Sequence, residues 1–438
     1  MNQWDCAEKL TEILEGTRHV YMWTEPEVVD FTAHSKGKVC IQSVRGKVEL
    51  ELARETLWTT LGLLSATVFS KDYVDLLLTW NFKSLCSYFR FYGSKRVVPE
   101  NSLLDLSPIE NFLGVNKKRP ENIGEAVNRM KVVQASKGWM PIYKTIHHPL
   151  MLKVLPSLET TPLLNEVTKS SQYAYYEIEG QTFGRLNCLK KFKQSYLPTT
   201  LGKETRQVLK PLGHKKRFLA ADFRACEVCV LQWLSQDAKL KEVIDSGEDL
   251  HSEIFRIVTE APCDTEDKRE RSKKMFLSVI YGSGPDGLAK NLGISSGVAK
   301  ELIRRMRYHF ATAFEWLDTK EKEAKKNGVV EDFVGRPRRF KEDDAYRVRD
   351  MMVQSTAATV CQEKLVALYN ALEGKDTQLC FVVHDGYYMV CSVKDARDSY
   401  LLVKQILESE SKLCPGLTMK VKIKFGAKLE PMKVLWRD

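Results

Sequence analysis

The chain has 438 residues, of which 43% are hydrophobic and 28% charged, and its formal net charge is +10. This length allows two or three folded domains, and the composition excludes a disordered or fibrous protein. The excess of Lys and Arg favours a polyanionic partner without identifying one. The eleven scattered cysteines exclude a small disulfide framework and indicate reduced, intracellular thiols.

The N-terminal residues Met1–Glu8 are polar and acidic, unlike a secretory signal peptide. No apolar run reaches the ~20 residues that a membrane-spanning helix needs. We therefore expect a cytoplasmic, intracellular protein with no membrane partner.

The first 150 residues carry few clear patterns. Residues 38–43 and 48–52 alternate between apolar and polar side chains, which predicts two antiparallel strands. Residues 72–78 and 123–133 are expected to be helical. We therefore predict an α/β domain over residues 1–150.

Residues 137–180 connect this domain to the rest of the chain. Trp139–Tyr143 predicts a turn at Pro141, and residues 148–156 predict a short helix that Pro156 closes. A basic series follows, which is either a solvated face or a surface for nucleic-acid phosphates. Its members are Lys190, Lys191, Lys193, Lys203, Arg206, Lys210, Lys215, Lys216 and Arg217.

Residues 218–221, Phe-Leu-Ala-Ala, form an apolar run of strand length that ends at Asp222. Apolar residues then recur at helical spacing from Cys226 to Leu234, so we expect a helix that packs back onto the sheet. A carboxylate at a strand tip suits metal binding, and a helix-capping Asp is the alternative. Cys226 and Cys229 share the apolar helix face, which favours core packing over zinc binding.

A second helix is predicted to begin near Thr265. Arg269, Lys273, Leu277 and Tyr281 follow at steps of four, so both cations project from one face. Binding of a triphosphate needs cations on one rigid face, whereas an ordinary basic surface stripe is the alternative.

The C-terminal part is predicted to contain a long helix over about residues 345–372 and then a hairpin. Its strands, residues 379–383 and 387–391, are joined through His384-Asp385-Gly386. Asp-Gly alone favours a type I′ turn. A carboxylate at this tip, beside Asp222 on a neighbouring strand, would instead suit two-metal phosphoryl transfer.

Together these segments resemble the motifs of the DNA polymerase I family (family A) over roughly residues 180–438. Asp222 and Glu227 match its motif A, the helix with Arg269, Lys273 and Tyr281 its motif B, and His384-Asp385 its motif C. The resemblance extends to segments around Arg185, His251, Arg338 and Gln354.

This resemblance implies an α+β fold, a right-hand polymerase with an antiparallel palm sheet and helical fingers. Residues 151–438 would form the polymerase domain, with the palm at about 175–238 and 331–438 and the fingers at about 239–330. The thumb is expected to be reduced or absent, because the preceding segment is too short for a long helical pair. Residues 1–150 faintly resemble a 3′–5′ exonuclease, ribonuclease H-like domain; an unrelated α/β accessory domain is the alternative.

The implied function is a template-directed DNA polymerase that extends a DNA primer with deoxyribonucleoside triphosphates. Two Mg²⁺ ions, replaceable by Mn²⁺, would be held by Asp222, Asp385 and the backbone carbonyl of Phe223, with Lys273 as a further catalytic residue. The implied nucleotide-binding residues are Arg269, Lys273, Tyr281, His251 and Glu227, of which Glu227 would select deoxyribonucleotides. The implied DNA-binding residues are Arg185, Gln354, His384 and Arg338.

Several positions depart from the family pattern. Gly386 stands where motif C has Glu, Leu277 replaces an aromatic residue, and Tyr346 and Asp350 replace an Arg and an Asn. In the exonuclease-like region, Cys86 replaces a metal-binding Asp.

The nearest match to the exonuclease's Asp-x-Glu is Asp30-Phe-Thr32, so we expect no proofreading. We also expect few nucleotides to be added per encounter unless a processivity or replication partner protein clamps the enzyme. An RNA polymerase or reverse transcriptase on the same palm stays open, as does a catalytically inactive, polymerase-shaped nucleic-acid-binding protein. Neither a replicative nor a repair role is favoured.

Overall fold

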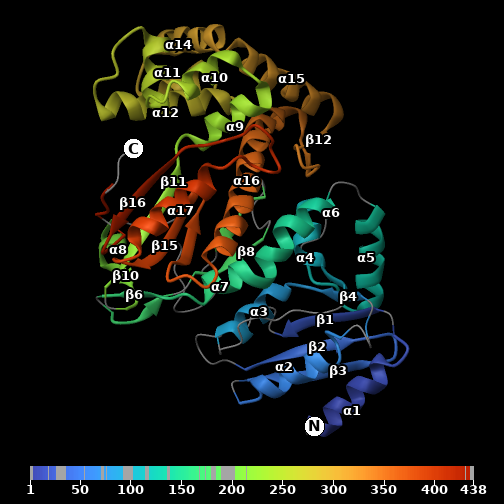
Figure 1. The fold of residues 1–438 in the computed structure, drawn as a ribbon. Helices are drawn as coiled ribbons and strands as arrows, with labels where there is room; N and C mark the ends of the chain where they lie inside the picture. Colours follow the sequence, from blue (N-terminus) through green and yellow to red (C-terminus); the bar gives the residue numbers. More distant parts are fainter. Residues whose placement is uncertain are drawn as a thin grey trace. The chain divides into compact units, whose positions relative to one another are not determined.

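The computed structural model divides the chain into two compact units, each described here by itself (Figure 1). Unit 1 comprises Met1–Asp222, Gln362–Ile406 and Ile423–Asp438, and unit 2 comprises Phe223–Cys361 and Leu407–Lys422. The structure describes residues 3–17, 19–25, 36–53, 55–70, 74, 76–91, 102–113, 118–135, 139–166, 168–172, 174–178, 184–188, 203–213, 215–429 and 431–434. The predicted domain boundary at residue 150 stays a prediction.

A five-stranded mixed sheet forms the N-terminal part of unit 1, in the order β3-β2-β1-β4-β5. The first three strands are antiparallel, as predicted for β2 and β3, whereas β4 and β5 run parallel to β1. The helix predicted over 72–78 is wrong, because Leu76–Thr79 is strand β4; short apolar runs do not distinguish a buried strand from a helix. The strands are β1 His19–Glu25, β2 Gly37–Gln42, β3 Lys47–Leu52, β4 Leu76–Thr79 and β5 Ser102–Asp105.

Five helices accompany this sheet among the described residues. Helix α3 begins where the buried Asp105 carboxylate accepts hydrogen bonds from the backbone N–H groups of Asn81 (3.1 Å) and Phe82 (2.6 Å). The helix predicted from residue 123 is confirmed as α5. The helices are α1 Gln3–Leu14, α2 Leu57–Ala66, α3 Phe82–Phe91, α4 Leu106–Leu113 and α5 Ile123–Ala135.

Residues 139–159 form one continuous helical run, not the turn and short helix that were predicted. It consists of α6 Trp139–Ile142, the π-helical segments η1 Tyr143–His147 and η2 Leu150–Val154, and α7 Leu155–Glu159. Pro141 and Pro156 lie inside this run. Pro156 is the second residue of α7 and directly follows the π-helical segment η2 and Leu155.

A second sheet of unit 1 has the strand order β14-β15-β11-β16. Its strands are β11 Lys216–Phe223, β14 Gln378–Val383, β15 Gly386–Ser392 and β16 Val421–Gly426. β11 pairs antiparallel with β15, and β15 pairs antiparallel with β14, as predicted for the hairpin. Helix α17, Ala396–Glu408, is attached to the start of this hairpin through Thr377 and Ser399, whose hydroxyls are 2.5 Å apart.

Shorter elements complete unit 1. The Tyr176 hydroxyl donates to the backbone carbonyl of Val382 and accepts from its N–H, at 3.0 Å each, which ties the connecting segment to β14. These elements are β6 Leu163–Asn165, β7 Ser171–Gln172, β8 Tyr176–Glu177, β9 Asn187–Cys188, α8 Lys203–Val208 and β10 Leu209–Pro211.

Unit 2 is mostly helical. Its helices are α9 Cys226–Ser235, α10 Ala238–Asp245, α11 Leu250–Thr259, α12 Glu266–Ile280, α13 Pro285–Leu292, α14 Ser296–His309 and α15 Ala311–Asn327. A two-stranded ribbon, β12 Val329–Glu331 and β13 Pro337–Arg339, leads into η4 Glu342–Arg347 and α16 Val348–Leu372. Helix α16 starts in unit 2 and passes into unit 1 at Gln362. No described helix is both long and apolar enough to cross a membrane.

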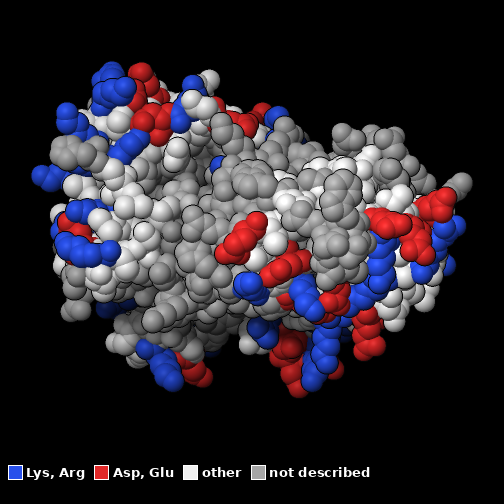
Figure 2. All heavy atoms as spheres, turned by 90° about the horizontal axis from the view of Figure 1, so that it is seen from below, with Lys and Arg blue, Asp and Glu red and all other residues white. Residues whose placement is uncertain are grey.

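On the face seen in Figure 2, acidic and basic side chains alternate among the described residues. Exposed ion pairs also occur near strands β2 and β3: Lys38–Glu49 (2.7 Å) joins the two strands, and Lys36, just before β2, pairs with Glu51 (3.2 Å). These exposed pairs contribute little stability individually.

Candidate active site

Asp222 lies at the solvent-exposed end of strand β11, one residue before the strand ends at Phe223. It does not cap the following helix: Ala225, with a φ of 51°, occupies the N-cap position of α9, without a side-chain cap. The capping alternative is therefore excluded. Cys226 and Cys229 are buried on α9, in agreement with core packing.

The hairpin between β14 and β15 brings its tip to this strand end. Gly386 is the cross-strand partner of Asp222 in β11 and of Val383 in β14. The loop is therefore the dipeptide His384-Asp385, and Asp-Gly does not form the turn. His384 adopts a left-handed φ of 53°, an uncommon conformation for a residue other than glycine. Asp385 is half-buried beside this strained residue.

Gly386 is required for space and not for a left-handed backbone. A Cβ atom here would lie 3.1 Å from Asp222 Oδ1, 3.2 Å from the Val383 carbonyl oxygen and 3.4 Å from Tyr388 Cε2. The position at which motif C of family A has Glu is therefore closely surrounded.

Tyr388 was missed in the sequence, where it reads only as one residue of a strand. Its ring stacks on that of Phe381, with centroids 4.2 Å apart and an interplanar angle of 13°. Burial raises the pKa of the Tyr388 hydroxyl, the charge of Arg206 lowers it, and the charges of Asp222 and Asp385 raise it. The hydroxyl therefore lies in the field of both candidate metal ligands.

The residues at this strand end fit a hard divalent cation. Carboxylate and backbone carbonyl oxygens are the ligands that Mg²⁺ prefers, and Asp222, Asp385 and the Phe223 carbonyl are donors of this kind. The space beside Asp222 Oδ1 is kept free by the absence of a Cβ at Gly386.

In unit 2, helix α12 begins as predicted, with the Thr265 hydroxyl accepting from the backbone N–H of Lys268. Arg269 is partly exposed and contacts Asp249 (3.0 Å), Glu266 (3.2 Å) and Glu270 (3.0 Å). Lys273 is exposed one turn further along. The predicted cationic face is therefore present, with Arg269 held by carboxylates.

His251 lies on the neighbouring helix α11 and faces this cationic surface. Burial lowers its pKa to about 4; Asp249 opposes this shift, and Lys273 and Arg269 add to it. Its Nδ1 atom is buried without a hydrogen-bond partner among the described residues. His251, Arg269 and Lys273 thus lie close enough to interact, on the neighbouring helices α11 and α12.

Tyr281 and Glu227 approach each other in unit 2. Burial raises the pKa of Tyr281 well above its ordinary value, and the Glu227 carboxylate and Asp350 raise it further, whereas Gln354 lowers it. No hydrogen bond of good geometry to a described residue reaches the buried Tyr281 hydroxyl. The structure therefore brings together three predicted site residues, Glu227, Tyr281 and Gln354, from α9, the end of α12 and α16.

Gly282 follows Tyr281 with a φ of +94°, and a Cβ atom there would lie 3.1 Å from Tyr346 Cδ2. Tyr346, at the position of the family's Arg, is thus packed over the end of α12, and 45% of its surface stays exposed.

The predicted DNA-binding residues are spread over several elements. Arg185 follows Gly184, whose carbonyl accepts a 2.6 Å hydrogen bond from Gln362 of α16. Arg338 lies on β13, half-buried. Of the basic series, Lys210 pairs with Glu166 (3.0 Å) and Lys216 with Asp376 (2.5 Å). Lys190, Lys191, Lys193 and the Lys203 side chain lie outside the described residues.

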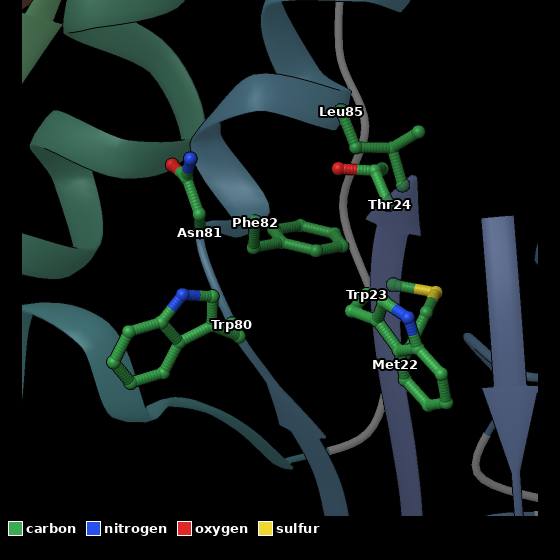
Figure 3. Close-up of a pocket in the computed structure, with 7 residues that line it drawn as sticks. All are labelled: Met22, Trp23, Thr24, Trp80, Asn81, Phe82 and Leu85. Carbon is green, nitrogen blue, oxygen red and sulfur yellow. The ribbon is translucent and has the colours of Figure 1, made fainter. Parts of the chain in front are cut away.

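A small hollow opens where the parallel strands β1 and β4 end in unit 1, an edge at which ligands often bind in such sheets. Figure 3 shows Phe82 pointing towards the strand that carries Trp23 and Thr24. None of the lining residues has a carboxylate; they are Met22, Trp23, Thr24, Trp80, Asn81, Phe82 and Leu85. Cys86 is buried, and burial raises the pKa of its thiol. Asp30-Phe-Thr32 lies outside the described residues.

The family model and the relatives that match this chain are all DNA polymerases. A family model described as DNA polymerase family A matches residues 111–430. Over 319 residues the chain is 28% identical to "DNA polymerase I, thermostable" of Thermus filiformis, covering 69% of this chain and 38% of that protein. Over 309 residues it is 26% identical to DNA polymerase I of Geobacillus stearothermophilus, covering 65% and 34% respectively. The chain thus spans little more than a third of these relatives' length.

Among solved structures, the chain resembles the POL domain of Pol1 from M. smegmatis, which was solved in complex with DNA primer-template and dNTP. The TM-score is 0.73 at 15% sequence identity, and the match covers 99% of both chains. This likeness establishes the mixed α+β fold over nearly the whole chain.

Proposed function

We propose that this chain, which belongs to DNA polymerase family A, is a template-directed DNA polymerase that extends a DNA primer with deoxyribonucleoside triphosphates. The observation that carries the proposal is the pairing of Asp222 with Gly386, next to Asp385 at the hairpin tip. This register sets two carboxylates on adjacent strand ends, the arrangement that two-metal phosphoryl transfer needs.

Family A polymerases generally use Mg²⁺, and Asp222, Asp385 and the Phe223 carbonyl would hold two such ions here, with Mn²⁺ as a substitute. When bound, these ions would supply Lewis acidity at the primer 3′-hydroxyl and at the phosphates. Asp222 and Asp385 contribute rigid placement, because both are attached to paired strands.

Arg269, Lys273 and His251 would bind the triphosphate. Arg269 is already oriented by Asp249, which also caps α11, so its guanidinium loses little conformational freedom on binding phosphate. Lys273 would add a charge that neutralises the leaving pyrophosphate. The hydrogen-bond capacity of the buried His251 Nδ1 is unused by the described residues.

Glu227 would select deoxyribonucleotides by blocking a 2′-hydroxyl sterically. Its proximity to Tyr281 supports this role, because the buried tyrosine limits where the carboxylate can lie. A pocket that merely leaves a hydroxyl unpaired discriminates only about 100-fold. The steric gate favours DNA synthesis over RNA synthesis.

The five-stranded sheet, with antiparallel β1–β3 and parallel β4 and β5, is compatible with a degenerate exonuclease-like domain. The carboxylate-free hollow and the buried Cys86 support a chain that lacks proofreading. The carboxylate of Asp105 is already engaged by backbone N–H groups.

The packing of the segment that connects the N-terminal sheet to the second sheet supports a reduced thumb. The helical run over residues 139–159 buries Trp139, Ile146, Leu150 and Leu155 and packs against α3. A helix covered in this way does not project as an arm around a duplex. The enzyme would then release its primer often unless a partner protein clamps it.

Gly386 favours one second candidate, a polymerase-shaped protein that binds nucleic acid without catalysis, because motif C lacks its Glu. Primer extension with Mg²⁺ distinguishes the two functions. We expect extension by the wild type and none by Asp222→Asn or Asp385→Asn, with primer-template affinity changed less than about threefold, since basic residues elsewhere bind the phosphates.

Asp398→Asn, which removes an exposed carboxylate of α17 in the same unit, is the matched control and should extend normally. A wild type that binds primer-template but never extends it would establish the second function. Extension by either site variant at the wild-type rate would remove the site assignment.

A further inference from the structure

Tyr388 shares one face of the sheet with the candidate metal ligand Asp222. Gly386 and Tyr388 are two residues apart on β15, and alternate residues of a strand point to the same side. Asp222 pairs directly with Gly386, and Ala220 pairs with Tyr388. The small side chain of Ala220 leaves room for the large ring on that face.

The ring edge of Tyr388 and the carboxylate of Asp222 border the same point of space. That point is the Cβ position of Gly386, which is 3.4 Å from Tyr388 Cε2 and 3.1 Å from Asp222 Oδ1. Because Gly386 has no side chain, no side-chain atom of residue 386 separates the tyrosine ring edge from the carboxylate.

The ring itself is rigidly held. Phe381 is its cross-strand partner on β14, and the two rings are stacked with centroids 4.2 Å apart. Phe381 is only 1% exposed, so the ring pair is anchored in the core. A side chain fixed in this way can fix its neighbour.

We propose that Tyr388 is a positioning residue of the metal site: its ring edge fixes the Asp222 carboxylate in its metal-binding orientation, in the place where family A has a third carboxylate. This inference rests on the proposed function. A neutral ring restricts Asp222 without adding a third negative charge, whose repulsion would favour protonation of the carboxylates. The site thereby retains an oriented Asp222 with two carboxylates.

The test measures the affinity of the protein for Mn²⁺. The concentration of the free ion is monitored by electron paramagnetic resonance. The protein is saturated with primer-template whose primer ends in a dideoxynucleotide, and with the next complementary nucleotide, so no reaction occurs. We expect Tyr388→Leu to weaken Mn²⁺ binding roughly tenfold, the lower end of the effect of losing an outer contact of a metal ligand. Tyr388→Phe, which keeps the ring, should restore wild-type affinity.

Tyr387→Phe is the matched control, because Tyr387 is buried and points to the opposite face of β15. If Tyr388→Leu does not fold, Phe381→Leu carries the test, since it removes the ring's support and should weaken Mn²⁺ binding to a lesser degree. Two results would overturn this inference and leave the proposed function standing. One is wild-type Mn²⁺ affinity in whichever Leu variant folds. The other is an equal loss of Mn²⁺ affinity in Tyr388→Phe and Tyr388→Leu. The proposed function fails together with this inference under a different result: the wild type binds no Mn²⁺, or its Mn²⁺ binding is unchanged in Asp222→Asn.

Discussion

Gly386 and Asp222 are cross-strand partners, and a Cβ atom on Gly386 would lie 3.1 Å from Asp222 Oδ1. The φ of Gly386 lies outside the left-handed region, so only space requires glycine here. The replacement of the family's Glu is therefore coupled to the packing of Asp222 and Tyr388, and a side chain restored at this position would displace its neighbours.

We expect Gly386→Ala to reduce primer extension roughly 10- to 100-fold, because a small displacement of a reacting or metal-binding group has effects of this size. Primer-template affinity should stay unchanged. Single-turnover extension and fluorescence anisotropy measure the two quantities. Gly297→Ala is the control, since a Cβ there meets nothing within 4 Å. Full activity in Gly386→Ala would show that Asp222 tolerates the methyl group.

The sequence was sufficient for features that depend on local spacing. The helix with Arg269 and Lys273, its Thr265 cap and the strand before Asp222 were predicted and are confirmed. Features that depend on register between distant strands were missed, such as the place of Tyr388 beside Asp222, because a Tyr in a strand carries no sign of its partner.

Two errors in local structure have different physical causes. Leu76–Thr79 is a buried strand whose neighbours β1 and β5 lie far away in the sequence, so tertiary pairing overrides local preference. Pro156 was expected to end a helix, but the helical run continues through it, with the π-helical segment η2 directly before α7.

Replacement of Glu227 by alanine should lower the discrimination against ribonucleotides. The carboxylate lies near the buried Tyr281, and its removal opens the space that a 2′-hydroxyl would need. The readout is the ratio of kcat/KM for a deoxyribonucleotide to that for the matching ribonucleotide, which should fall at least about tenfold. Glu242→Ala, on the exposed side of α10, is the control. An unchanged ratio would place sugar selection elsewhere.

His251 should make the stability of the protein depend on pH. Its pKa in the folded protein, about 4, lies below the ordinary value of 6.5. Between about pH 4 and pH 6.5 the imidazole is therefore protonated in the unfolded chain but neutral in the folded protein. The contribution of His251 is fully present above pH 6.5 and is lost as the pH falls towards 4, by at most about 1.4 kcal/mol per pH unit.

The His251→Gln variant, which cannot take up this proton, should lose less unfolding free energy than the wild type between about pH 7 and about pH 5. Urea unfolding at both pH values measures the difference. His309→Gln, at the half-buried C-terminal end of α14, is the comparison variant. Equal pH dependence in His251→Gln and wild type would contradict the assignment.

Among the described residues of unit 1, the ion pair between Lys83 and Glu159 should be a sensitive electrostatic contact, because both side chains are buried. The side chains are 4% and 0% exposed, with Nζ and Oε1 2.5 Å apart. Glu159 also accepts from the Ser87 hydroxyl (2.5 Å) and the Tyr176 N–H (2.8 Å). Burial disfavours both charges, lowering the pKa of Lys83 and raising that of Glu159, whereas each charge stabilises the other.

Removal of Lys83 alone would leave a buried carboxylate without its counter-charge. We therefore expect Lys83→Met to lower the free energy of unfolding by about 3–5 kcal/mol, as found when one partner of a buried pair is lost. Lys83→Met combined with Glu159→Gln should recover part of this loss, because the neutral amide still accepts from the Tyr176 N–H. In the exposed pair Lys36–Glu51, Lys36→Met should change the free energy by less than about 1 kcal/mol. Urea unfolding, monitored by tryptophan fluorescence, compares the variants. A Lys83→Met protein as stable as Lys36→Met would show that Glu159 becomes protonated without a loss of unfolding free energy.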